Sequence, residues 1–146
     1  MVKYRVSVLK KVISVIILSL YLFASVQDIE QKIYNEIFSS IYKNKKIVKI
    51  WVDDGDNFHN LKKRRFIFVE NPKQADILIL NHYVDIDIDR PIFVRKYYLT
   101  KKYKDRVIGG FYWQKGRANI IFIKRNLSKY GIELPKNFSM YIQESR

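Results

Sequence analysis

Short apolar runs separated by turns constrain the fold of this chain more than any other feature. After residue 46, six of them follow one another: IVKIWV, FIFVE, ADILIL, PIFVR, VIGGFYW and ANIIFI. Runs of this length and composition are typical of β-strands, and those without alternating polar residues are typical of strands buried on both faces. We expect an α/β domain with a mostly parallel sheet, helices on both faces and a late antiparallel hairpin. This is the architecture of flavodoxin-like or Rossmann-like three-layer folds.

Helical periodicity appears before the first strand and again in the second half of the chain. Over residues 28–42, apolar residues recur at intervals of three and four, which predicts an amphipathic helix with one face on a core. A shorter helix is expected within residues 97–105. Two more close the chain, over residues 127–130 and from residue 135 to about residue 143.

Small and polar residues mark the expected turns and helix ends. Gly116 lies in the four residues QKGR between the last two strands, where a hairpin turn needs positive φ. Asn126 is expected to cap the helix that follows, and Gly131 is expected to stop it. Gly109 and Gly110 are grouped with these residues as structural positions.

The first 25 residues have the layout of an export signal. Four basic residues lie within the first eleven, and the stretch from Val12 to Ala24 carries no charge. Its 13 residues suit a signal peptide and are fewer than the ~20 of a membrane-crossing helix, so cleavage is favoured. Leu22 or Phe23 would stand where a cleavage site prefers a small residue, so an N-terminal anchor stays open as the alternative. Residues 26–146 then form a single α/β domain.

The chain is strongly basic, which bears on its partners. Its net charge is +14, and residues 26–146 hold 24 Lys and Arg against 14 Asp and Glu. Such a surface favours anionic partners, including lipid headgroups, nucleic acid and acidic polymers. The basic runs at 62–65 and 101–106 would suggest nucleic acid in a cytosolic protein, but the export signal argues against that partner.

The residue types of most catalytic sites are missing. The chain has no cysteine and only two histidines, and its five glycines form neither a dinucleotide fingerprint nor a phosphate loop. We therefore expect a binding protein without a cofactor. No metal site is expected either, because the acidic cluster after the first strand lacks the later Gly and Glu of a calcium loop. If a metal bound, the candidate ligands would be Asp54, Asp56, His82 and Asp85.

The segment GGFYWQKGR, residues 109–117, is the most unusual local sequence. On a strand, the middle one of its three aromatic rings faces opposite to the other two, so at least one ring must point outward. Aromatic residues with Arg are typical of interface hot spots and of stacking platforms, although these rings could equally complete the core. The candidate partner-binding residues are Phe111, Tyr112, Trp113, Gln114, Lys115 and Arg117.

From residue 47 onward, the order of features resembles the YfiR family of small periplasmic regulators. The resembling parts are ADILIL, PIFV, the pair Gly109 and Gly110, NIIFIKRNL and KYGIEL. The resemblance implies an exported α/β protein that binds a membrane signalling protein, as the best-known members bind the periplasmic part of a membrane diguanylate cyclase. The cysteines that form disulfides in some members are missing here. Residues 109–117 also resemble a GGFxWQKGR-like stretch of small uncharacterised exported bacterial proteins.

Three hypotheses for function follow. The first is an exported, non-enzymatic regulatory module that contacts a membrane signalling protein, with Trp113, Lys115 and Arg117 as the contact edge. The second is a periplasmic protein that binds a small ligand or an anionic polymer, using the strand ends near Asp53 and the same hairpin. The third is a metal-dependent enzyme, with its ligands in the two acidic clusters. All three leave the oligomeric state open.

Overall fold

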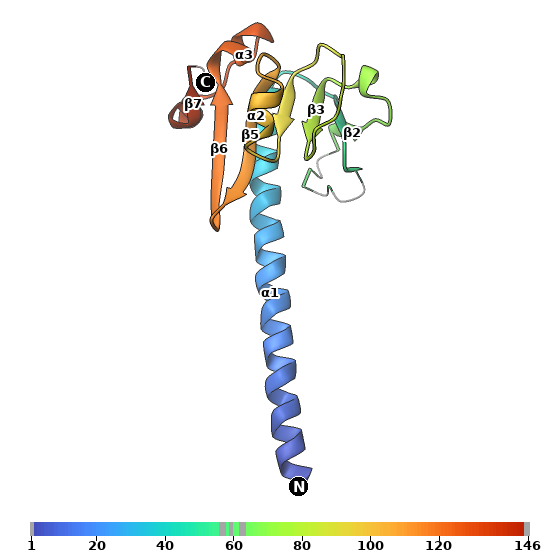
Figure 1. Cartoon of the computed structure of the whole chain (residues 1–146), viewed down its shortest axis with the longest axis vertical. Coiled ribbons are helices and arrows are strands. Elements are labelled where there is room, and N and C mark those ends of the chain that lie inside the picture. Colours follow the sequence, from blue (N-terminus) through green and yellow to red (C-terminus); the bar gives the residue numbers. More distant parts are fainter. Residues whose placement is uncertain (1, 56–57, 59, 62–63, 145–146) are drawn as a thin grey trace.

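A seven-stranded sheet lies at the centre of the domain, and a 40-residue helix passes along one face and continues far beyond it (Figure 1). The structure is a computed structural model that describes residues 2–55, 58, 60–61 and 64–144. Within the long helix, it describes the backbone but not the side chains of residues 2–7, 18 and 20–24. The expected α/β organisation, with a mostly parallel sheet and a late hairpin, is confirmed.

Short strands and short helical segments follow the long first helix. In chain order they are α1 (Val2–Ile41), β1 (Val48–Val52), β2 (Phe66–Phe68), the 3-10 helix η2 (Pro72–Gln74), β3 (Ile77–Leu80), β4 (Ile92–Val94), α2 (Leu99–Lys102), β5 (Val107–Gln114), β6 (Arg117–Ile123), α3 (Lys124–Lys129), the 3-10 helix η3 (Lys136–Tyr141) and β7 (Ile142–Gln143). All six apolar runs of the sequence therefore contain a strand.

The order of the strands across the sheet is β2-β1-β3-β4-β5-β6-β7. Neighbouring strands run parallel everywhere except between β5 and β6, which form the antiparallel hairpin. The first five strands have the 2-1-3-4-5 order of flavodoxin-like sheets, whose ligands bind outside the carboxyl ends of the strands. In this sheet, β1, β3, β4 and β5 end on the side from which the first half of α1 projects (Figure 1).

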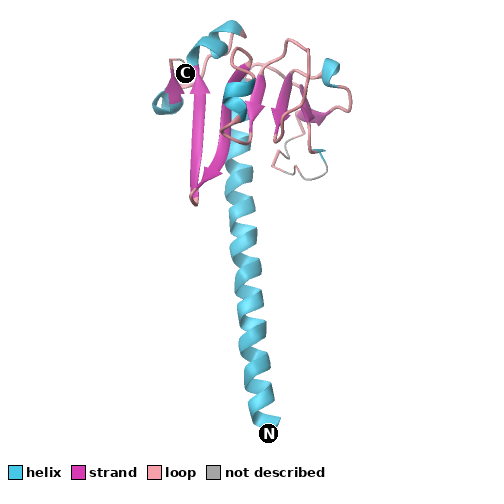
Figure 2. Ribbon diagram, viewed as in Figure 1, coloured by secondary structure: helices cyan, strands magenta, loops and turns pink. Residues whose placement is uncertain are grey.

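Apolar side chains of the central strands alternate between two core layers, one on each face of the sheet, whose strands are drawn in magenta in Figure 2. In β3, Ile77 and Ile79 face the α1 side, whereas Leu78 and Leu80 face the side of α2. The second half of α1 packs on the first layer because its apolar residues share one face. A short helix and an extended segment, α2 and residues 81–91, cover the second layer. Because both faces of β3 are buried, its four residues are all apolar.

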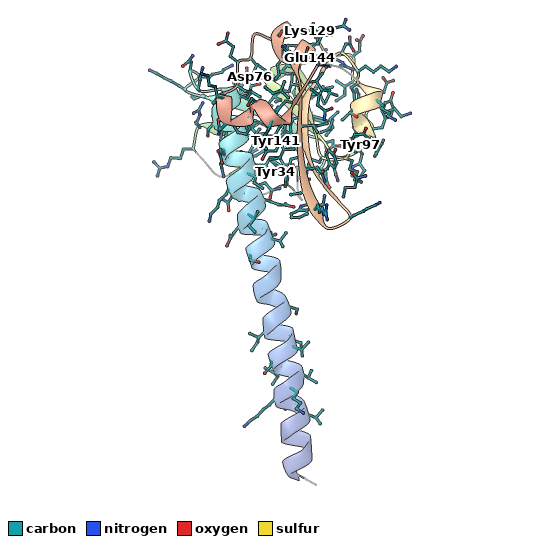
Figure 3. All side chains as sticks on the ribbon, turned by 90° about the vertical axis from the view of Figure 1, so that its left-hand side faces the viewer. Tyr34, Asp76, Tyr97, Lys129, Tyr141 and Glu144 are labelled. Carbon is teal, nitrogen blue, oxygen red and sulfur yellow. The ribbon has the colours of Figure 1, made fainter. Side chains whose placement is uncertain are left out.

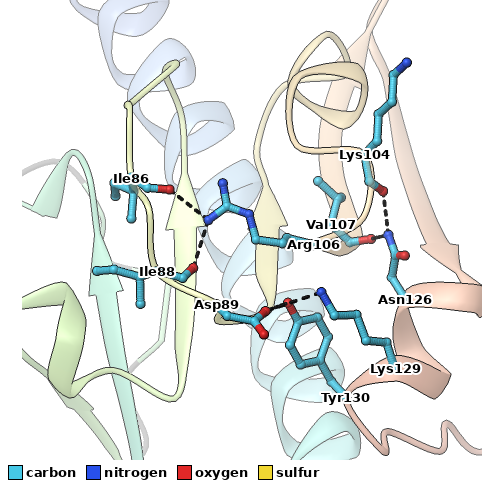
Figure 4. Close-up of polar contacts among 9 residues, drawn as sticks. All are labelled: Ile86, Ile88, Asp89, Lys104, Arg106, Val107, Asn126, Lys129 and Tyr130. Atoms are coloured by element: carbon cyan, nitrogen blue, oxygen red, sulfur yellow. Dashed lines mark hydrogen bonds and ion pairs between the residues drawn. The ribbon is translucent and has the colours of Figure 1, made fainter.

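The extended segment between β3 and β4 is held on the domain by polar contacts (Figure 4). The Arg106 guanidinium donates to the carbonyl oxygens of Ile86 and Ile88, at 2.8 Å each. The Tyr130 hydroxyl donates to the Asp89 carboxylate at 2.8 Å, and this contact lowers the pKa of that carboxyl. The aspartates of the segment are exposed and its isoleucines are half-buried, so the segment alternates as a strand does. It nevertheless pairs with none of the strands in the described part of the chain.

The predicted helix over residues 28–42 is confirmed, but α1 also extends back to Val2 without a break. The expected export signal and the first helix of the domain are therefore one continuous element. Among the helical residues whose side chains the structure describes, no stretch is both long enough and apolar enough to cross a membrane.

The prediction that Asn126 caps the next helix is wrong. Asn126 lies inside α3, which follows Ile123 directly, and its side chain is buried. Its amide donates to the carbonyl oxygens of Lys104 and Val107, at 2.7 Å each (Figure 4). Asn126 therefore joins α3 to the chain that enters β5, which lies about 20 residues earlier.

The end of α3 is as predicted, whereas the last expected helix differs. Gly131 has φ +65°, and its N–H and that of Ile132 close the helix on the Ser128 and Leu127 carbonyls. The helix expected from residue 135 to about residue 143 is instead the 3-10 helix η3, and residues 142–143 are the strand β7. Residues 142–143 pair with the open edge of β6, and this extended pairing ends the helix η3 at Tyr141.

Candidate functional site

The crevice at the carboxyl ends of β1 and β3 is where a sheet of this order binds ligands. Asp53 follows β1 and fills this position. Its carboxylate accepts hydrogen bonds from the backbone N–H of Asn81, at 2.8 and 2.9 Å, and of His82, at 2.7 Å. Asp53 thus joins the ends of the two strands, and this role uses the acceptor capacity that a ligand would need.

The metal candidates do not converge in the described part of the chain, where no group of three His, Cys, Asp or Glu side chains could hold a metal ion. His82 is exposed and its Nδ1 lies 3.7 Å from the Asp53 carboxylate. Asp85 is exposed on the extended segment. Asp54 follows Asp53 in the β1–β2 loop, and Asp56 lies outside the described residues.

Farther along the same edge, aromatic side chains close the gap between α1 and the sheet. Tyr34 of α1 lies edge-on to Phe58, Phe93 and Phe111, with ring centroids 5.3–5.9 Å apart. Burial raises the pKa of the Tyr34 hydroxyl far above its usual value, although the nearby Arg95 opposes the rise. Tyr34 is therefore neutral at physiological pH and is no proton acceptor.

The hairpin turn between β5 and β6 has the expected geometry. Lys115 and Gly116 have φ values of +50° and +71°, as the two central residues of a type I′ turn require. Such a turn matches the twist of the two strands, so the hairpin projects as a continuous ribbon. In Figures 1 and 2, it points along α1 toward its N-terminal end.

The predicted alternation of the three hairpin aromatics is confirmed, and it narrows the contact edge. Phe111 is buried against Tyr34 on the α1 side, and Tyr112 is buried on the other side, 5.5 Å from the Tyr97 ring. Both rings complete the core and leave no surface for a partner. Trp113, on the same side as Phe111, is 44% exposed. The exposed candidate residues are those we call the hairpin tip: Trp113, Gln114, Lys115 and Arg117.

One carboxylate fixes the hairpin tip against the long helix. The Trp113 indole N–H donates to one oxygen of Glu30, and the Asn60 amide donates to the other at 3.3 Å. Glu30 lies where α1 enters the domain, 83 residues before Trp113. The side chains of Gln114, Lys115 and Arg117 make no hydrogen bond or ion pair with any described residue. The hairpin tip thus combines a fixed aromatic ring with unpaired cations.

The glycine pair of the hairpin has a different role from the one expected. Gly109 and Gly110 lie inside β5, not in a turn, where neighbouring strands approach closely. A Cβ at Gly109 would lie 2.6 Å from the Ile121 carbonyl oxygen, and one at Gly110 would lie 2.7 Å from Val94 Cγ2. The register of β4 and β5 also shifts here, so these glycines allow an irregularity in the middle of the sheet.

A second basic feature is a depression of about 500 Å³ beside α2. Ile121 and Ile123 line it together with three cations, Lys101, Lys104 and Arg125, and one acid, Asp105. Within the described chain, none of the three cationic side chains forms a hydrogen bond or ion pair. No local motif in the sequence brings these residues together, because they come from α2, the loop after it and α3.

Comparison with protein-family models, curated proteins and solved structures finds no match to this chain. The resemblance to the YfiR family therefore stays a prediction from the sequence.

Proposed function

We propose that this chain is an exported, non-enzymatic module that regulates a membrane signalling protein by binding it. The hairpin tip is the contact edge. The observation that carries the proposal is Trp113, a large ring that is 44% exposed yet held in place by Glu30, beside the unpaired Lys115 and Arg117. A pre-positioned aromatic ring and an arginine are the side chains that most often dominate binding energy at protein interfaces.

Photo-crosslinking tests this proposal at single residues. A photoreactive amino acid at Lys115 or Arg117 is expected to trap one discrete membrane protein in cells. The same group at Met140, which is 80% exposed on η3, is the matched control and is expected to trap none. Trp113→Ala should reduce the yield at position 117 by at least tenfold, because hot-spot truncation costs about 2 kcal/mol or more. Equal labelling from positions 117 and 140 would contradict the proposed edge.

A second candidate function is the binding of an anionic ligand, and the depression beside α2 favours it. Lys101, Lys104 and Arg125 surround apolar side chains there, which suits an anion with an apolar part. A thermal-shift screen with phosphate, citrate and fatty-acid anions tests it. A ligand at 100 times its Kd is expected to add about 2.7 kcal/mol of stability. Lys104→Glu should abolish the shift, whereas Lys43→Glu, on the opposite side of the sheet, should retain it.

A further inference from the structure

The first half of α1 leaves the domain, and no other described segment of the chain packs against it. Figure 3 shows the sheet and its side chains gathered around one end of α1, with Tyr34 at the level where the helix enters. Beyond that level, the seven apolar side chains at residues 8, 9, 12, 13, 15, 16 and 17 are each 46–67% exposed. Successive residues of a helix differ by about 100° in direction, so these side chains cover more than half of its circumference. A helix that packs on a soluble core exposes a polar face instead.

Two serine hydroxyls of this segment are satisfied within the helix itself. The Ser14 hydroxyl donates to the Lys10 carbonyl oxygen at 2.9 Å, and that of Ser19 donates to the Ile16 carbonyl oxygen at 2.7 Å. Bonds of this kind let serine lie in an apolar medium, where an unpaired hydroxyl would be costly. The surface of this segment therefore suits lipid better than water.

Charges delimit the segment at both ends. Residues 12–27 carry none, whereas Lys10 and Lys11 precede them and Asp28 follows. These residues extend over about 24 Å of helix, somewhat less than the ~30 Å of a bilayer core. Lysine side chains close such a gap because their apolar stems lie along the lipid while their amines reach the headgroups. The excess of basic residues before the segment places that end on the cytoplasmic side.

We propose that this part of α1 is retained after export and lies in the lipid bilayer, with Lys10 and Lys11 at the anionic cytoplasmic headgroups. The domain then stands on the outer surface of that membrane. Retention agrees with two features of residues 22–25: they lie within an unbroken helix, and Leu22 or Phe23 occupies a position where cleavage needs a small side chain.

This anchor would also set the height of the hairpin tip, and this second step rests on the proposed function. The turn lies two to three residues beyond Trp113, a distance of about 7–10 Å along the strand. A helix covers the same distance with about five to seven residues. Counted from Glu30 toward the N-terminus, that distance ends near residues 23–25, where the apolar segment ends. The hairpin tip would therefore meet the membrane-proximal part of a partner.

Fractionation of cells that express the full-length chain with a C-terminal tag tests the anchor. We expect the intact mass, including residues 1–25, and retention of most of the protein in carbonate-washed membranes. Ile16→Glu should move most of it to the soluble fraction. Ile29→Glu is the matched control, because Ile29 has a similar exposure, 48% against 52%, but lies beyond Asp28; it should stay with the membranes. A soluble chain that begins near Val26, or equal behaviour of the two variants, would overturn the proposal.

The height of the hairpin tip has its own readout. The chain has no cysteine, so a fluorophore can be attached at Ala118→Cys, next to the turn, or at Met140→Cys as a control. In phosphatidylglycerol and phosphatidylethanolamine vesicles with spin-labelled headgroups, we expect at least threefold stronger quenching at position 118. Equal quenching would overturn the inferred height but not the anchor. If quenching at position 118 is strong but position 117 traps no membrane protein, the inferred height stands and the proposed partner is contradicted.

Discussion

Replacing Phe111 with alanine is expected to lower the free energy of unfolding by about 3–5 kcal/mol, the usual cost of removing a buried phenylalanine ring. Phe111 is 2% exposed and lies edge-on to Tyr34 with ring centroids 5.4 Å apart. The small side chain would leave a cavity between α1 and β5, which the surrounding rigid strands cannot fill. Urea unfolding of the full-length chain in detergent, followed by far-ultraviolet circular dichroism, measures the loss.

Trp113→Ala is the matched control for this variant. It removes a larger ring from the same face of the same strand, but nearly half of that ring is already in water. We expect it to cost less than about 2 kcal/mol, including its hydrogen bond to Glu30. An equal or greater loss for Trp113→Ala would mean that this ring is also part of the core, and the hairpin tip would lose its central contact.

The two variants separate stability from binding within one tripeptide. Phe111→Ala should reduce partner capture only in proportion to the fraction of unfolded protein. Trp113→Ala should reduce capture while the domain stays folded. Within residues 111–113, the first two rings are therefore part of the core, one on each face of the sheet, and the third is available for contact. The change of face from one residue to the next follows from the two-residue period of a strand.

The sheet could be predicted from sequence because its central strands, β3 and β4, are buried on both faces. ILIL in β3 has no polar residue to interrupt it, and the next strand along the sheet, IFV in β4, is the same. The hairpin could be predicted because its turn needs positive φ, which Gly116 supplies, and because alternation along a strand is strict. These signals are local, so one sequence was enough to find them.

Contacts between distant segments could not be predicted. Asn126 precedes Leu127 and Ser128 as a helix cap would, but its partners are carbonyl groups 19 and 22 residues earlier. Glu30 and Trp113 are 83 residues apart, and only the packing of α1 on β5 brings them together. Of the candidate site, the sequence therefore predicts the exposed ring and cations, whereas the carboxylate that fixes them appears only in the fold.

Gly109→Ala is expected to destabilise the domain by about 1–3 kcal/mol or more, although it adds a single methyl group. The new Cβ would lie 2.6 Å from the Ile121 carbonyl oxygen and 2.7 Å from Phe122 Cδ1. A backbone oxygen cannot turn aside as a flexible side chain can, so β5 and β6 must separate where the hairpin joins the sheet. The same urea unfolding experiment measures the effect.

Gly55→Ala provides the control, because its Cβ would meet no atom of the described residues within 4 Å and its backbone has no positive φ. Alanine there restricts the unfolded chain without straining the folded one, so a change between zero and about 1 kcal/mol of added stability is expected. The same substitution should thus have opposite signs at two positions. If Gly109→Ala were as stable as Gly55→Ala, β5 and β6 would not be packed as closely as the structure places them. The hairpin would then be free to move relative to α1, and a contact edge that depends on a fixed Trp113 would have no rigid support.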